Sequence, residues 1–140
     1  MPIEYLEHTA DLGLLVNATT LEEAFCEAAR GLFSLMLDVA TIEPRQAYAV
    51  RLRAPTSAAL LVEWLSDLLA QKELTGLVFS EFDVRVARDR DGCRLVGTAS
   101  GETLDPTKHR PRVEVKGISY LGLDVRCDNG GWVAQCVLDV

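Results

Sequence analysis

The sequence predicts an α+β fold of two layers, in which a mostly antiparallel or mixed β-sheet carries two main amphipathic helices on one face. Two stretches place apolar residues at helical spacing, and about seven others alternate between apolar and polar residues. Several of the alternating stretches are joined by sequences typical of tight hairpins. At 140 residues, the chain can bury a core as one domain, residues 1–140, without disulfides or a structural metal.

The first predicted helix begins with a capping box. Thr20 can accept a hydrogen bond from a free amide at the helix start, while Glu23 reaches back. Apolar residues then recur at helical spacing as far as about Asp38. Gly31 lies inside this helix and weakens it by about 1 kcal/mol relative to alanine, so we expect a close packing contact there.

The second helix begins at Thr56 or Ser57, either of which can cap it, and its region ends at Gly76. A short mixed segment, residues 3–8, precedes the first strand. The strands are expected at residues 12–18, 48–54, 77–88, 94–100, 113–118, 121–127 and 132–138. Asp91-Gly92 and Asn129-Gly130 are strong hairpin turns because both pairs tolerate positive φ. The stretch 101–111 is expected to be a polar loop.

Charge and hydropathy exclude several classes of function. The net charge of -7 argues against a protein that grips phosphate backbones through a broad basic face. No apolar run approaches the ~20 residues of a membrane span, and the first residues do not resemble a signal peptide. We therefore expect a cytoplasmic protein with no membrane partner.

One loop is rich in basic residues, with Lys108, His109, Arg110 and Arg112 close together. This cluster could hold a phosphate or an acidic partner, but a charged loop without a partner is commoner. No role is assigned to the loop from the sequence.

The four cysteines lack the close spacing of zinc or redox motifs. In the predicted last hairpin, Cys127 faces Trp132 and Cys136 faces Leu123. These two cysteines would then lie roughly 13 Å apart along the ladder, too far for a disulfide. We expect reduced, buried thiols with no catalytic role.

Acidic residues near the two extremes of the sequence are the best candidates for a metal site. The segment from His8 to Asp11 offers an imidazole and a carboxylate, although Asp11 could simply bond its own backbone in a turn. Asp139 and the main-chain carboxylate of Val140 add two more acidic groups. Three carboxylates could form an all-oxygen site for a hard divalent cation. A frayed, solvated end is the alternative, but the alternation continues almost to the last residue.

Little in the sequence points to a catalyst that works alone. Alternation places Glu114 and Lys116 on the face opposite Val113 and Val115, as in an ordinary solvated strand. The chain has no glycine-rich phosphate loop, no HExxH pattern and no GxSxG elbow.

The ordered set of motifs along the chain resembles the archease family. The motifs are Tyr5-Leu6-Glu7-His8-Thr9-Ala10-Asp11, Thr20-Leu21-Glu22-Glu23-Ala24-Phe25, Gly31-Leu32-Phe33-Ser34-Leu35-Met36, Leu61-Val62-Glu63-Trp64-Leu65, Val78-Phe79-Ser80-Glu81-Phe82, Val113-Glu114-Val115-Lys116-Gly117-Ile118-Ser119-Tyr120 and Asp139-Val140. Each motif alone is weak, whereas their order and spacing are specific. The similarity covers nearly the full length.

The resemblance implies a protein cofactor of the RtcB-type RNA ligase, with no catalysis of its own. That ligase joins a 2′,3′-cyclic phosphate or 3′-phosphate end to a 5′-hydroxyl end, as in tRNA splicing. It uses GTP and manganese and forms a GMP–histidine intermediate. The archease is expected to promote that guanylylation and to permit multiple turnovers, in a chaperone-like manner. RNA would be reached only indirectly, through the ligase.

The resemblance also implies roles for particular residues. Asp11, Asp139 and Val140 correspond to the positions that bind a divalent metal ion, expected to be Ca²⁺, Mg²⁺ or Mn²⁺. Lys116 corresponds to a lysine required for activity, and so would serve to activate the partner. His8 is expected to lie next to the metal ligands and to support them without binding the ion itself. We further expect the two ends of the chain to form one metal-bearing acidic tip that enters the ligase.

Two other functions fit the same residues. A metal-dependent phosphoester hydrolase would use the carboxylates to activate water, although no general base is evident. A metal-independent chaperone or adaptor would act by surface contact alone. The sequence does not predict an oligomeric state.

Overall fold

The structure is a computed structural model that describes residues 3–8 and 11–140, with the side chains of residues 6–8 outside that description. In chain order the elements are β1 (Ile3–His8), β2 (Asp11–Ala18), α1 (Leu21–Met36), η1 (Val39–Thr41), β3 (Gln46–Ala54), α2 (Ser57–Thr75), β4 (Leu77–Asp89), β5 (Gly92–Thr103), α3 (Pro106–His109), β6 (Gly117–Asp128) and β7 (Gly131–Asp139). The predicted α+β class is therefore confirmed.

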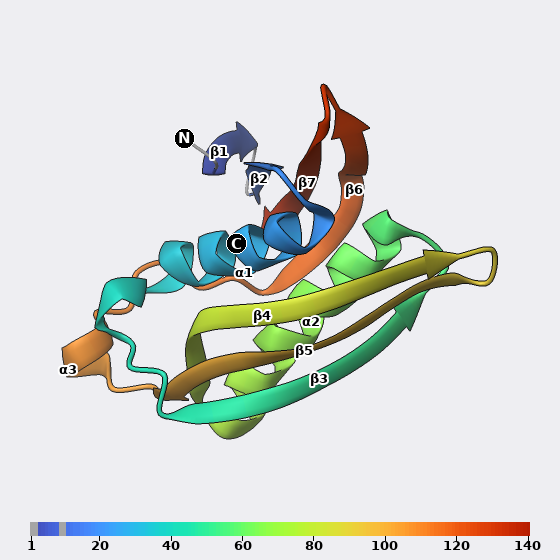
Figure 1. Ribbon diagram of the computed structural model, residues 1–140. Helices are drawn as coiled ribbons and strands as arrows, with labels where there is room; N and C mark the ends of the chain where they lie inside the picture. The colour runs from blue at the N-terminus through green and yellow to red at the C-terminus, as the bar shows by residue number, and fades with distance from the viewer. Residues whose placement is uncertain (1–2, 9–10) are drawn as a thin grey trace.

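The strands form two antiparallel sheets, ordered β1-β2-β7-β6 and β3-β5-β4. Helix α1 contacts β2 and β4, and helix α2 contacts β3 and β6, so each helix touches both sheets (Figure 1). This arrangement refines the expected one, because the helices cover one face of each of two sheets. Among the described residues, no helix is long and apolar enough to cross a membrane.

Both long helices begin at the predicted caps. The Thr20 hydroxyl accepts a hydrogen bond from the Glu23 amide, and the Thr56 hydroxyl accepts one from the Ala59 amide, both at 3.1 Å. The reciprocal half of the capping box differs from the prediction, because the Glu23 carboxylate accepts from the Thr19 hydroxyl instead. At the other end of α2, Gly76 adopts φ +78° and closes the helix, as expected.

The helices are held to each other and to the first sheet by close contacts. The fully buried Trp64 of α2 donates its indole N–H to the Phe25 carbonyl of α1 at 2.9 Å. Gly31 makes the expected close contact, since a Cβ there would lie 2.9 Å from Leu14 Cδ1. The Tyr5 hydroxyl of β1 donates to the Gly31 carbonyl at 2.9 Å. The missing side chain therefore lets α1 lie directly against β1 and β2.

The prediction of a separate strand at 113–118 was wrong. Residues 113–116 belong to no strand, and β6 runs from Gly117 to Asp128 with a register shift between Ser119 and Asp124. The Arg112 amide instead donates to the Met36 carbonyl at 2.7 Å, so this segment runs past the end of α1. Alternating polarity shows which side chains are covered, but not which backbone supplies the hydrogen bonds. The predicted loop at 101–111 likewise begins inside β5 and contains α3.

The cysteine predictions were right in part. All four cysteines are free, and Cys127 pairs with Trp132 as expected. Cys127 is exposed and Cys26 is only half-buried, which corrects the expectation of four buried thiols. Burial raises the pKa of Cys136 to about 12, so that thiol stays protonated at neutral pH. The bulge in β6 displaces the expected Leu123–Cys136 pairing.

We predict that Trp64→Phe lowers the free energy of unfolding by about 2–3 kcal/mol, because it removes the hydrogen bond to Phe25 and leaves a cavity. Leu74→Ala is the control on the same helix, since Leu74 is 80% exposed, and it should change stability by less than about 0.5 kcal/mol. Urea denaturation measures both values. Equal stability of the two variants would contradict this assignment.

Candidate metal centre

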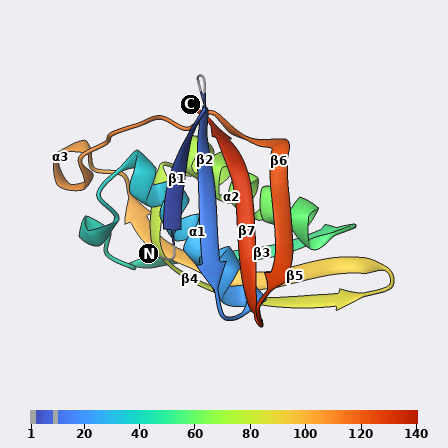
Figure 2. The same cartoon turned by 90° about the horizontal axis from the view of Figure 1, so that it is seen from above.

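The two acidic residues from opposite ends of the sequence meet across one strand pair. Strands β2 and β7 are antiparallel, and their register places Asp11 directly opposite Asp139. Leu138, next to Asp139 and paired with Leu12, lies in the core, so by alternation the two aspartates share the outer face of the sheet. Figure 2 shows the start of β2 and the end of β7 together at one end of the sheet.

A hollow open to solvent lies at this position. It is lined by Asp11, Gly117, Ile118, Ser119 and Asp139. Gly117 of β6 pairs with Asp139 on the side away from Asp11, and a Cβ at Gly117 would meet no atom within 4 Å. There is therefore free space beside the aspartates. Sequence reasoning missed Gly117 and Ser119 as lining residues, although Gly117 follows the Lys116 position directly.

The end of β7 is packed and does not fray. Val140 is half-buried and packs against the hydrophobic core. The Lys116 amide donates to the Asp139 carbonyl at 2.7 Å. Lys116 itself is exposed and lines a neighbouring hollow with Ala70 and Glu73 of α2. The structure thus brings Asp11, Asp139 and the main chain of Lys116 together. Lys116 also lines the second hollow beside them.

His8 is paired with Asp11 in the β1–β2 ladder. Its side chain lies outside the described residues, as do Thr9 and Ala10 of the same motif. The expected supporting role of His8 therefore stays a prediction.

The donor chemistry at the aspartate pair suits a hard divalent cation. Two like charges placed directly opposite each other in a sheet destabilise it, and a bound cation would offset that cost. Ca²⁺, Mg²⁺ and Mn²⁺ all prefer oxygen ligands such as carboxylates. Among the described residues, no three His, Cys, Asp or Glu side chains are grouped to hold a metal. Ser119 also lines the hollow, and the main-chain oxygens of Val140 follow Asp139 directly in the chain, so the residues fit an ion with an incomplete protein shell.

Two residues of the basic loop, Lys108 and His109, are paired with an acid inside the protein. The buried Glu102 carboxylate accepts hydrogen bonds from the Glu43 amide at 2.8 Å, from Lys108 Nζ at 2.8 Å and from His109 Nε2 at 2.9 Å. The fully buried His109 also accepts the Asp105 amide at Nδ1, which places its proton on Nε2. The amide of Glu43, then Lys108 and His109, lower the pKa of Glu102 to about 2. Lys108 and His109 are therefore committed to a structural contact.

The comparisons with known proteins agree on one family. The model of the archease protein family matches residues 3–140. The archease of Thermococcus gammatolerans is 42% identical over 138 residues, which cover 98% of this chain and 97% of that protein. The archease of Methanopyrus kandleri is 36% identical over 140 residues and the full length of both.

Two solved structures resemble the chain. The solution structure of protein 1598 of Methanobacterium thermoautotrophicum matches with a TM-score of 0.88 at 30% identity, covering 99% of each chain. A crystal structure from Thermotoga maritima, described as an archease and possible chaperone, matches with a TM-score of 0.61 over 98% of this chain and 96% of that one. Its 16% identity supports the fold alone.

We predict that Asp11→Asn raises the free energy of unfolding by about 0.2–1 kcal/mol in EDTA, because it removes the repulsion across the β2–β7 pair. Glu81→Gln removes the same charge from an exposed position opposite Ser100 and should have little effect. Urea denaturation in the chelator measures both. A loss of stability on Asp11→Asn would show that the aspartates do not repel each other.

We also predict that the Glu102 contact fails in acid. The pKa of Glu102 in the folded protein, about 2, lies below its ordinary value of 4.5, so its stabilisation is complete above pH 4.5 and is lost as the pH falls towards 2. Glu102→Gln should therefore destabilise the protein more at pH 6 than at pH 3. Urea midpoints at the two pH values test this, and an equal loss at both would refute it.

Proposed function

The chain belongs to the archease family, and from that premise we propose that it is a non-catalytic activator of an RtcB-type RNA ligase in tRNA splicing and RNA repair. It promotes guanylylation of the ligase and allows multiple turnovers, with RNA held by the ligase. The contact is made by an acidic tip, which we define as Asp11, Asp139 and Val140. The observation that carries this proposal is the cross-strand placement of Asp11 opposite Asp139.

The geometry of the acidic tip supports a metal-bearing role. The aspartates lie on the outer face of the sheet, beside the open space at Gly117, so a partner can approach them. Asp11 and Asp139 would hold a divalent ion together with the main-chain oxygens of Val140, and that ion would supply positive charge for phosphate or nucleotide oxygens of the partner. Because protein ligands leave the shell incomplete, positions remain for groups of the ligase.

Lys116 adds a cation next to the tip. Its amide is bonded to the Asp139 carbonyl, which ties the position of Lys116 to the end of β7. Its exposure leaves the ammonium group available to an anionic group of the ligase. We therefore assign Lys116 to contact with the partner.

We predict that Asp11→Asn and Asp139→Asn each reduce multiple-turnover stimulation of the ligase by about 10–100-fold, as when a metal site is impaired. The measurement is RNA ligation with limiting cognate ligase and excess GTP, with and without this protein. Glu81→Gln is the matched control and should stimulate fully. Lys116→Ala should also lose stimulation.

Full stimulation by both aspartate variants would overturn the tip model. Calcium titration followed by thermal unfolding separates metal binding from activation, because an ion that binds only the folded state raises Tm. Wild type and Lys116→Ala should be stabilised by calcium, whereas Asp139→Asn should not.

The same samples distinguish the two other functions. Turnover of a generic phosphoester by the protein alone with Mg²⁺ or Mn²⁺ would favour a hydrolase. Stimulation that survives chelation of the metal would favour a metal-independent adaptor, in keeping with the Thermotoga maritima protein described as a possible chaperone.

A further inference from the structure

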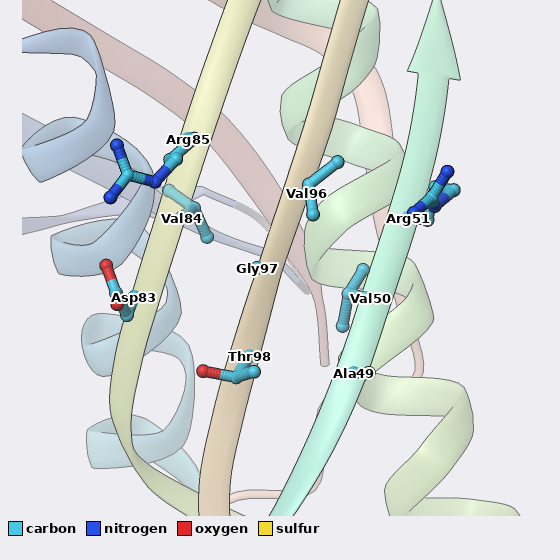
Figure 3. Close-up of a pocket in the computed structure, with 9 residues that line it drawn as sticks. All are labelled: Ala49, Val50, Arg51, Asp83, Val84, Arg85, Val96, Gly97 and Thr98. Atoms are coloured by element: carbon cyan, nitrogen blue, oxygen red, sulfur yellow. The ribbon is translucent and has the colours of Figure 1, made fainter.

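Four arginines gather on the outer face of the β3-β5-β4 sheet. They are Arg51 and Arg53 on β3, Arg85 on β4 and Arg94 on β5. Arg51 and Arg85 are both paired with Val96, one from each side, and Arg53 is paired with Arg94. Figure 3 shows Arg51 and Arg85 on the two strands that flank Val96, with the helices behind the sheet. We call these four residues the arginine face.

Ion pairs engage only part of the arginine face. Arg94 forms an ion pair with Asp89 at 3.2 Å. Within the part of the chain that the structure describes, Arg51, Arg53 and Arg85 form no ion pair. Arg53 and Arg94, like charges directly opposite each other, are unfavourable for the sheet. Glu81, Asp83 and Asp89 of β4 lie on the same outer face, so the four arginines exceed these acids by one charge, on a chain whose net charge is -7.

The surface between the arginines is shallow and has a floor of small side chains. One hollow is lined by Ala49, Gly97, Thr98 and the exposed Val96, and a second, lined by Arg53 and Arg94, follows along β5. Acids line both hollows: Asp83 lines the first on its β4 side, and Asp89 and Asp91 line the second. Gly97 faces the inner side of the sheet, where a Cβ would lie 2.3 Å from the Asp83 carbonyl and 2.8 Å from Cγ1 of the buried Val84. Neither hollow is lined by an aromatic side chain.

We propose that the arginine face binds the phosphate backbone of single-stranded RNA without sequence preference. The planar guanidinium group matches phosphate oxygens in pairs, and all four cations are arginines. Arg51 and Arg53, two residues apart on β3, are separated by roughly 7 Å along the strand. Arg51 and Arg85 are separated by roughly 10 Å across β5. The arginine face can therefore contact several phosphates together. The hollows offer small aliphatic side chains but no aromatic anchor of the kind that dominates protein–protein contacts, which favours a phosphate backbone over a protein partner.

This proposal goes beyond the proposed function, in which the ligase alone holds RNA. The two sheets enclose the helices, so the arginine face and the outer face that carries the acidic tip point away from each other. One protein could therefore contact RNA on one side and the ligase on the other.

The test is fluorescence anisotropy of the full chain with a fluorescein-labelled oligouridylate, longer than the ~4–16 nucleotides of a typical single-strand site. Binding should weaken between about 50 and 200 mM potassium chloride. The double variant Arg51→Gln/Arg85→Gln should weaken binding roughly ten-fold or more and reduce the salt slope by about 1.4. Arg110→Gln/Arg126→Gln removes the same charge outside the arginine face and should bind RNA like wild type.

Three results would overturn the proposal. They are no RNA binding at the lower salt concentration, equal weakening by the two double variants, or equally tight binding of labelled polyglutamate, which would indicate an acidic protein partner. The substituted side chains point away from the core. Thermal denaturation checks that the double variant is folded. If it is not, the single variant Arg85→Gln repeats the test and should show part of the loss of RNA binding. Ligase stimulation is measured separately, so failure here would leave the proposed function intact.

Discussion

The antiparallel pairing of β2 with β7 is the constraint on which the candidate site depends. It joins residues from the two extremes of the sequence in one ladder and sets Asp11 against Asp139. The inner face of the same ladder supplies Leu14, Val16 and Cys136 to the core. Because side chains alternate in a strand, the burial of that inner face fixes the aspartates on the outer face. A slip of either strand by one residue would turn its own aspartate toward the core, so the core packing also enforces the site.

Helices between the two sheets give the molecule two independent outer faces. Trp64 ties α2 to α1, and Gly31 lets α1 approach β1 and β2 closely. Each helix contacts both sheets, so its buried surface is broad and the sheets are separated by a full helical layer. One outer face then carries the acidic pair and the other carries the arginines. This helical layer keeps the acidic pair and the arginines apart, so the two sets of charges do not pair with each other.

Charged residues of the same type have different roles according to their neighbours. Lys108 and the buried His109 are committed to Glu102, which fastens the loop after β5 to the chain before β3. Arg51 and Arg85 have no such acid opposite them, since both face Val96. Two residues of the basic cluster in sequence are thus engaged inside the protein, whereas the arginine face is assembled from three strands.

Sequence alone determined the local elements, because caps, turns and periodicity act over a few residues. The starts of both long helices, the end of α2 at Gly76 and the α+β class followed from such signals, and the family motifs pointed to Asp11, Asp139, Val140 and Lys116. Only the tertiary structure decided that the strands divide into two sheets, that residues 113–116 run past α1, and which basic residues are exposed. Those outcomes depend on backbone hydrogen-bond partners and on register between distant strands, which alternating polarity within one segment does not encode.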